Sequence, residues 1–127
     1  MVFRRQWLFL FKQAAFNWRL LIKKIEIRAS KEYNKSFSGL TDNLLSDKVN
    51  EAIEFLKKDK NLGNKIQKNL WPKRYRNIYH IDNLWRYNIG SHRLIYTIIT
   101  EYDTKTYALL DVLSHPKYEE LFNYRNG

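Results

Sequence analysis

The chain has 127 residues, enough for one domain, and its 44% hydrophobic and 16% aromatic content predicts a packed core, which excludes a disordered tail. The absence of cysteine excludes disulfide bonds and thiolate metal sites. The formal net charge of +10 favours a polyanionic partner, with nucleic acid first and an anionic membrane or an acidic protein second.

The positive charge is concentrated in two blocks of the sequence. Residues 1–31 carry 8 basic groups and 1 acidic group, and residues 64–93 carry 7 and 1. The segments between and after these blocks have more acidic than basic groups. A dedicated binding face for a polyanion explains this pattern, and a generally solvated basic surface is the alternative.

Residues 1–22 are predicted to form a basic amphipathic N-terminal extension. Apolar residues recur there at helical spacing, at Trp7, Phe11, Ala14, Trp18 and Leu21. The unbroken apolar run is far shorter than the ~18 residues of a spanning helix, and no cleavage site for a signal peptide follows it. We therefore expect no stable membrane insertion and a cytoplasmic location. The extension can lie on a membrane, pack on a partner or on this domain, or result from a start codon chosen too early.

The next segment predicts one strand and two helices. Lys24–Arg28 alternates apolar and charged residues, as a strand does. Ser30 is a suitable N-cap for a helix that continues to Phe37. A second helix has one apolar face, and Gly63 is its expected stop. The residues of that face are Leu45, Val49, Ala52, Ile53 and Leu56.

The C-terminal half predicts three strands and a short helix. Pro72 stops any preceding helix, and strands are expected over residues 84–89, 92–102 and 107–113. A helix with Pro116 at its first position follows. The three strands should form an antiparallel meander with the helix pair on one face. The fold class is thus α+β, a helix pair packed on a small antiparallel sheet, in a domain of residues 23–127.

Three segments in this order resemble the RelE/ParE toxin superfamily. They are the strand–turn–strand of Leu84–Tyr96, the last strand and tail of Leu110–Phe122, and the start at Lys24–Tyr33. The resemblance implies the toxin of a type II toxin–antitoxin module, with a cognate antitoxin as partner. RelE-like members cut messenger RNA on the ribosome without metal or other cofactor, whereas ParE-like members inhibit DNA gyrase.

The same resemblance implies where the site residues lie. RelE-like enzymes carry basic residues before the meander, an arginine on its middle strand, and basic, histidine or tyrosine groups near the C-terminus. The matching catalytic candidates are Arg93, His115, Lys117 and Tyr118. The matching RNA-binding candidates are Lys68, Lys73, Arg74, Arg76 and Arg86. The chain departs from the best-known member at Pro116, near which that member has an arginine.

These residue types suit metal-free RNA cleavage, which needs a base, an acid and cations around the reacting phosphate. A guanidinium meets two phosphate oxygens at once, so Arg93 suits the phosphate, and the imidazole of His115 can act as base or acid. We expect both to face one cleft. The alternatives are structural: Arg93 paired with Asp111, His115 as a strand end, Tyr118 as a packing residue, Lys117 as a solvated lysine, and a basic loop over core aromatics.

Three functions remain open on this evidence. The first is a ribosome-associated endoribonuclease. The second is a ParE-like gyrase inhibitor, which acts by protein contact and needs no catalytic cluster. The third is a catalytically inactive RelE-fold module that binds RNA or protein.

Overall fold

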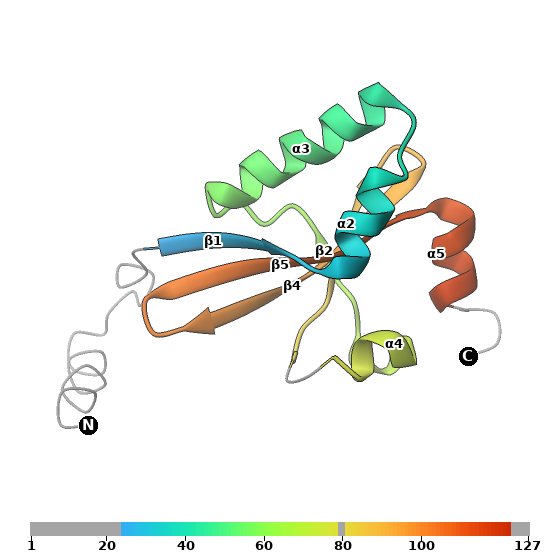
Figure 1. Ribbon diagram of the computed structural model, residues 1–127. Coiled ribbons are helices and arrows are strands. Elements are labelled where there is room, and N and C mark those ends of the chain that lie inside the picture. The colour runs from blue at the N-terminus through green and yellow to red at the C-terminus, as the bar shows by residue number, and fades with distance from the viewer. Residues whose placement is uncertain (1–23, 79–80, 123–127) are drawn as a thin grey trace, which may run out of the picture.

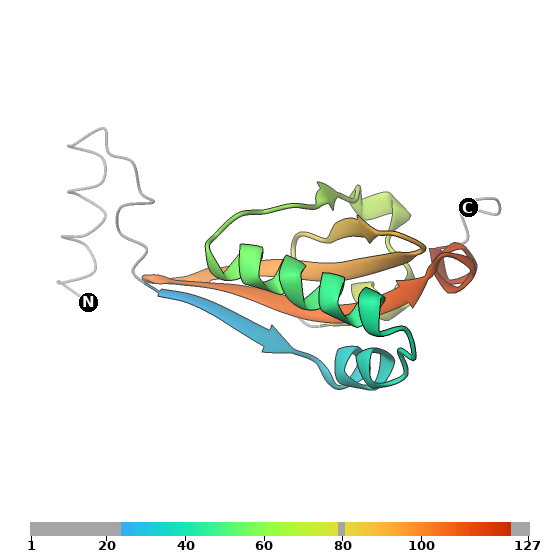
Figure 2. The same ribbon diagram turned by 90° about the horizontal axis from the view of Figure 1, so that it is seen from above.

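The computed structural model describes residues 24–78 and 81–122, which form a five-stranded sheet with helices on both faces (Figures 1 and 2). The strand order is β1-β5-β4-β3-β2. The strands are β1 (Lys24–Ala29), β2 (Asn64–Lys65), β3 (Trp85–Ile89), β4 (His92–Glu101) and β5 (Thr104–Ser114). The helices are α2 (Lys31–Ser38), α3 (Asn43–Lys57), the 3₁₀ turn η2 (Lys68–Leu70), α4 (Lys73–Arg76) and α5 (His115–Phe122). The predicted extension of residues 1–22 lies outside the described residues.

The predicted fold class is confirmed, and the meander β3-β4-β5 is antiparallel as expected. The place of β1, which the sequence left open, is beside β5 and parallel to it, from Lys24 opposite Thr104 to Ala29 opposite Leu109. The small strand β2 pairs with β3 and was not predicted. These pairings make β5 a central strand, in agreement with its nearly continuous apolar sequence.

Ser30 lies between β1 and α2 and is the N-cap of α2, as expected. Its side chain accepts a hydrogen bond from the Tyr33 N–H at 3.0 Å and donates to the Leu110 carbonyl at 2.9 Å. One hydroxyl therefore caps the helix and attaches it to β5. Beyond Ala29 the chain leaves the sheet, and α2 rather than a strand lies beside the C-terminal part of β5 (Figure 1).

The first core lies between the helix pair and one face of the sheet. The predicted stripe of α3 is buried at Leu45, Val49, Ala52 and Leu56, with Ile53 partly buried. It packs against residues from β3, β4 and β5 that alternate along their strands, including Leu94, Tyr96 and Tyr107. The predicted stop at Gly63 was wrong, because α3 ends at Lys57. The chain turns there with Asp59 at a φ of 60°.

The second core lies on the opposite face, beneath α4 and α5. Its buried residues are Ile66, Trp71, Tyr75, Leu84, Ile95, Leu110, Leu113, Tyr118 and Phe122. A bulge in β5 contributes to this core, because Ile95 lies opposite Asp111 while Tyr96 lies opposite Leu109. Leu110 is the extra residue, and the bulge lets both Leu110 and Asp111 face α4. The helix after Pro72 was not predicted, since α4 has only 4 residues.

We predict that Gly63→Ala destabilises the domain by about 1–3 kcal/mol, the usual cost of overpacking. A Cβ at this position would lie 2.5 Å from the Tyr96 hydroxyl and 3.0 Å from the Arg86 carbonyl. The Gly63 N–H also donates to that hydroxyl at 2.9 Å, so the loop has little room to move away. The measurement is the free energy of unfolding in urea.

Gly39→Ala is the matched control. A Cβ there would meet its nearest atom, the Ser36 carbonyl oxygen, at an ordinary 3.5 Å, and φ is −80°. We expect this variant to be neutral or slightly stabilised. Equal effects of the two substitutions would contradict the close packing of Gly63.

Candidate functional site

Four of the predicted residues meet where β3, β4 and α5 converge. Arg93 Nη2 lies 2.9 Å from His115 Nδ1, and Arg86 Nη1 donates to the Tyr118 hydroxyl at 2.9 Å. The guanidinium carbons of Arg86 and Arg93 lie 5.6 and 5.8 Å from the centre of the Tyr118 ring. We call these four residues the arginine–histidine cluster. The expected juxtaposition of Arg93 and His115 is thus present.

The strand register produces this cluster. Arg86 and Arg93 alternate with residues of the first core, so both project to the opposite face, the one that α5 covers. The α5 helix begins directly after β5, and the His115 N–H donates to the Ser91 carbonyl at 2.8 Å. That bond fixes the start of α5 to the turn before β4. His115 and Tyr118, one helical turn apart, therefore both reach Arg93.

Tyr118 forms the buried centre of the cluster. It is 1% exposed and stacks on Phe122, with ring centres 4.3 Å apart. Two guanidinium groups against one ring hold two positive charges close together, which cation–π attraction to the ring offsets. Arg86 Nε is buried without a hydrogen-bond partner among the described residues. His115, by contrast, is exposed, and Arg93 is half-buried, so these two groups are accessible to a ligand.

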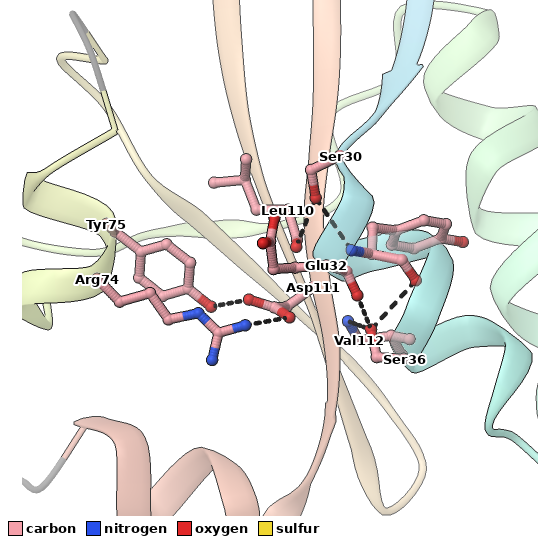
Figure 3. A network of polar contacts seen from close by, with 9 residues as sticks. Ser30, Glu32, Ser36, Arg74, Tyr75, Leu110, Asp111 and Val112 are labelled. Atoms are coloured by element: carbon pink, nitrogen blue, oxygen red, sulfur yellow. Dashed lines mark hydrogen bonds and ion pairs between the residues drawn. The ribbon is translucent and has the colours of Figure 1, made fainter.

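A second arrangement surrounds the buried carboxylate of Asp111, which is 2% exposed (Figure 3). Its oxygens accept hydrogen bonds from the Tyr75 hydroxyl at 2.6 Å and from Arg74 Nη2 at 2.8 Å. Burial raises the pKa of Asp111, and the bond from Tyr75 and the charge of Arg74 counteract this increase. Burial and the neighbouring Asp111 raise the pKa of Tyr75, so it stays a donor. Asp111 thus pairs with Arg74, and its suggested pairing with Arg93 was wrong.

The other predicted residues lie apart from the cluster. Lys68 lies 5.7 Å from the Trp71 ring centre, and Arg76 donates to the Asn69 carbonyl at 3.2 Å. Both line a surface depression of about 430 Å³. Lys73 is exposed on α4, and Lys117 is exposed on α5. The basic segment therefore does cover core aromatics, as the alternative held, while its cations remain accessible at the surface.

A groove of about 690 Å³ lies at the outer edge of β5. We call it the β5-edge groove. The groove is lined by two predicted site residues, Arg74 and Lys117. It is also lined by Lys31, Lys35 and His92, which were not predicted as site residues. The two lysines could have been recognised as neighbours on one helix face, because they lie four residues apart on the polar face of the predicted helix. No comparable signal marked His92, whose pKa burial lowers.

Residues 24–78 and 81–122 contain no helix long and apolar enough to cross a membrane. Within the same residues, no group of three or more acidic or histidine side chains is placed to hold a metal ion.

Comparison with known proteins identifies the fold. No protein-family model matches the chain, and neither does any curated protein sequence. Among solved structures, the RelE of the archaeal RelE–RelB complex from Pyrococcus horikoshii OT3 is similar, with a TM-score of 0.50 and 14% identity over 73% of this chain and 97% of that chain.

Two further structures are similar to the same extent. A YoeB/ParE toxin from Agrobacterium tumefaciens has a TM-score of 0.52 and 14% identity, covering 71% of this chain and 98% of its own. The toxin–antitoxin complex RelBE2 from Mycobacterium tuberculosis gives 0.50 and 17%, covering 72% and 99%. The chain therefore has the fold of the RelE/ParE toxin superfamily.

We predict that Asp111→Ala lowers the free energy of unfolding by about 1–3 kcal/mol, because the buried Tyr75 hydroxyl loses its acceptor. Asp111→Asn keeps an acceptor oxygen and should cost less. Asp47→Ala, at an exposed position of α3, is the control and should stay within about 0.5 kcal/mol. Denaturant unfolding measures all three, and an Asp111→Ala protein as stable as the control would contradict the assigned role.

Proposed function

We propose that the protein is the toxin of a type II toxin–antitoxin module and cleaves messenger RNA on the ribosome without a metal ion. The observation that carries this proposal is the contact between Arg93 and His115 at an accessible surface. A guanidinium, which can donate to phosphate oxygens, and an imidazole, which can accept or donate a proton, lie 2.9 Å apart, close enough to act on one phosphate. The fold is consistent with this activity.

The hydrogen bond from Arg93 defines the starting state of His115. A guanidinium only donates, so Nδ1 must be the accepting, unprotonated nitrogen, and the ring proton is then on Nε2. When a phosphate enters, the Arg93 fork moves to its oxygens, where two parallel hydrogen bonds form. Nδ1 then loses its donor and becomes a base.

In the reaction, His115 takes the 2′-hydroxyl proton, and the 2′-oxygen attacks the adjacent phosphorus. The bond from phosphorus to the 5′-oxygen breaks, which leaves a 2′,3′-cyclic phosphate and a 5′-hydroxyl. Arg93 stabilises the negative charge that develops on the phosphate oxygens. The proton that His115 has taken then passes to the leaving 5′-oxygen, and we assign Lys117, which lines the adjoining groove, as a donor to phosphate. No redox step or cofactor is needed.

The remaining predicted residues have supporting roles in this proposal. Tyr118, predicted as a catalytic candidate, is buried and holds the two guanidinium groups in place, so we assign it a positioning role. Arg86 adds positive charge behind Arg93. Lys68, Lys73 and Arg76 present cations to the RNA backbone.

We predict that Arg93→Ala leaves the protein folded and lowers RNA cleavage by about 10²–10³-fold, the usual cost of one preorganised transition-state donor. Arg28→Ala removes an exposed arginine from the edge strand β1, outside the arginine–histidine cluster, and is the matched control. The measurements are growth arrest on induction and the mapping of cut sites on cellular transcripts. Full cleavage by folded Arg93→Ala protein would overturn the assignment.

A DNA gyrase supercoiling assay with purified protein separates RNA cleavage from the gyrase alternative. Inhibition of supercoiling together with uncut transcripts would replace the proposed function by a ParE-like one. A protein that is inactive in both assays would be the third alternative, a binding module.

We also predict a cognate antitoxin that silences the toxin by covering Lys73, Arg74 and Arg93, or by displacing α5. An acidic and apolar segment, helical in part, suits this surface, and charge complementarity should make the association rate fall as salt rises. Co-expression with the neighbouring small gene and copurification test this prediction. A protein that captures no partner and is harmless alone would contradict the toxin–antitoxin assignment.

A further inference from the structure

The β5-edge groove follows from where β1 stops. β1 pairs with β5 only as far as Leu109, and residues 110–114 of β5 have no strand on that side. The α2 helix lies there instead (Figure 3). Val112 N–H donates to Ser36 Oγ at 3.2 Å, and the Leu110 carbonyl accepts from Ser30. Because serine side chains occupy these backbone groups, another strand cannot add to this part of the edge.

The charge of the groove identifies its ligand. Lys31, Lys35 and Lys117 are exposed, line the groove and make no ion pair with any described residue. Glu32 is the acidic residue that lines it without an ion-pair partner in the described chain. Three unpaired ammonium groups thus face one carboxylate, which favours an anion with several charges spread along its length.

Arg74 is the cation of the groove that a buried side chain holds in place. Its Nη2 is held by Asp111, which is 2% exposed and bonded to Tyr75, while 41% of the Arg74 side chain is accessible. The buried carboxylate therefore fixes the guanidinium at the groove wall and leaves its other N–H donors for a ligand. An arginine held in this way loses little side-chain entropy when it binds a phosphate.

The groove adjoins the arginine–histidine cluster. His92 and Ser114 line it and are register partners on β4 and β5. Ser114 and Lys117 lie on either side of His115 in sequence, and Arg93 follows His92. An extended chain that lies in the groove thus has its next segment at the proposed cleavage residues.

We propose that the β5-edge groove binds the backbone of single-stranded RNA next to the scissile phosphate, with Lys31, Lys35 and Arg74 as phosphate contacts. This inference rests on the proposed function and extends its RNA surface to α2. The occupant is an RNA strand rather than a peptide strand, because the serines block strand addition and the lining is cationic. In steady-state terms, the lysines contribute to binding and not to the chemical step.

The test measures binding of a fluorescent single-stranded RNA whose 2′-hydroxyls are methylated, so that it cannot be cleaved. The variant is Lys31→Gln with Lys35→Gln. The control is Lys48→Gln with Lys58→Gln, which removes the same charge from α3 and its C-cap, outside the groove. We expect the negative slope of log affinity against log salt to become shallower by about 1.4 in the variant, about 0.7 for each lost phosphate contact, and to stay unchanged in the control.

Cleavage of unmodified RNA provides the second readout. The groove variant should raise KM and leave kcat within about twofold of the unaltered protein, because the reacting groups are intact. A slope equal to that of the unaltered protein, or an equal loss in the control, overturns the inference. So does a variant that binds RNA normally and has lost only the antitoxin.

Failure of the proposed function gives a different pattern. If Arg93→Ala does not affect cleavage, or no RNA is cut, the catalytic assignment falls, while the salt slope still reports on the groove. If cleavage depends on Arg93 but the slope does not depend on the two lysines, only the groove assignment falls.

Discussion

The carboxylate of Asp111 is the constraint on which the arrangement around β5 depends. A charge this deep in a protein is stable only when its oxygens are hydrogen-bonded, and here both donors come from α4. Four residues of helix have little stability of their own, so the pair of bonds and the burial of Tyr75 hold α4 on the sheet. The bulge at Leu110 is what directs Asp111 to that face.

The position of the arginine–histidine cluster depends on Tyr118. It fills the second core with Phe122 and at the same time supports the two arginines that flank it. Because α5 packs through these aromatic rings, the position of His115 at its start depends on the same contacts. The proposed catalytic pair therefore sits on a rigid strand and a short packed helix, which restrict the geometry that general acid–base chemistry requires.

Local signals predicted most of the fold. Trp85, Tyr87 and Ile89 follow the alternating period of a strand, and the stripe from Leu45 to Leu56 follows the period of a helix. Both faces pack as expected. The parallel position of β1 was not predictable in this way, because it depends on residues about 80 positions apart. Without a family model or a curated match, no sequence comparison supplied it either.

The site was predictable as a set of residue types but not as a set of partners. Arg93 and His115 were predicted from the family resemblance and from their chemistry, and the register of β4 then places them in contact. The structural alternative paired Arg93 with Asp111, yet the bulge turns Asp111 toward Arg74. A bulge adds one residue and reverses which face a side chain takes, and nothing in an apolar strand such as Ala108–Leu113 marks its position. The position of Lys31 and Lys35 beside β5 depends on where β1 ends, which their spacing in the sequence does not give.

The basic residues of the domain are concentrated on the side of α4 and α5 rather than on α3. The helix α3 carries acidic and basic residues in near balance, and the segment 32–63 has 5 basic and 6 acidic groups. The basic segment 64–93 instead includes α4, Arg86 and Arg93, on the face that α5 covers. A polyanion that approaches the domain is therefore attracted to the α4–α5 side and not to α3, before any specific contact forms. In the proposed function, orientation of the RNA by this field precedes its fixation by Arg74 and Arg93.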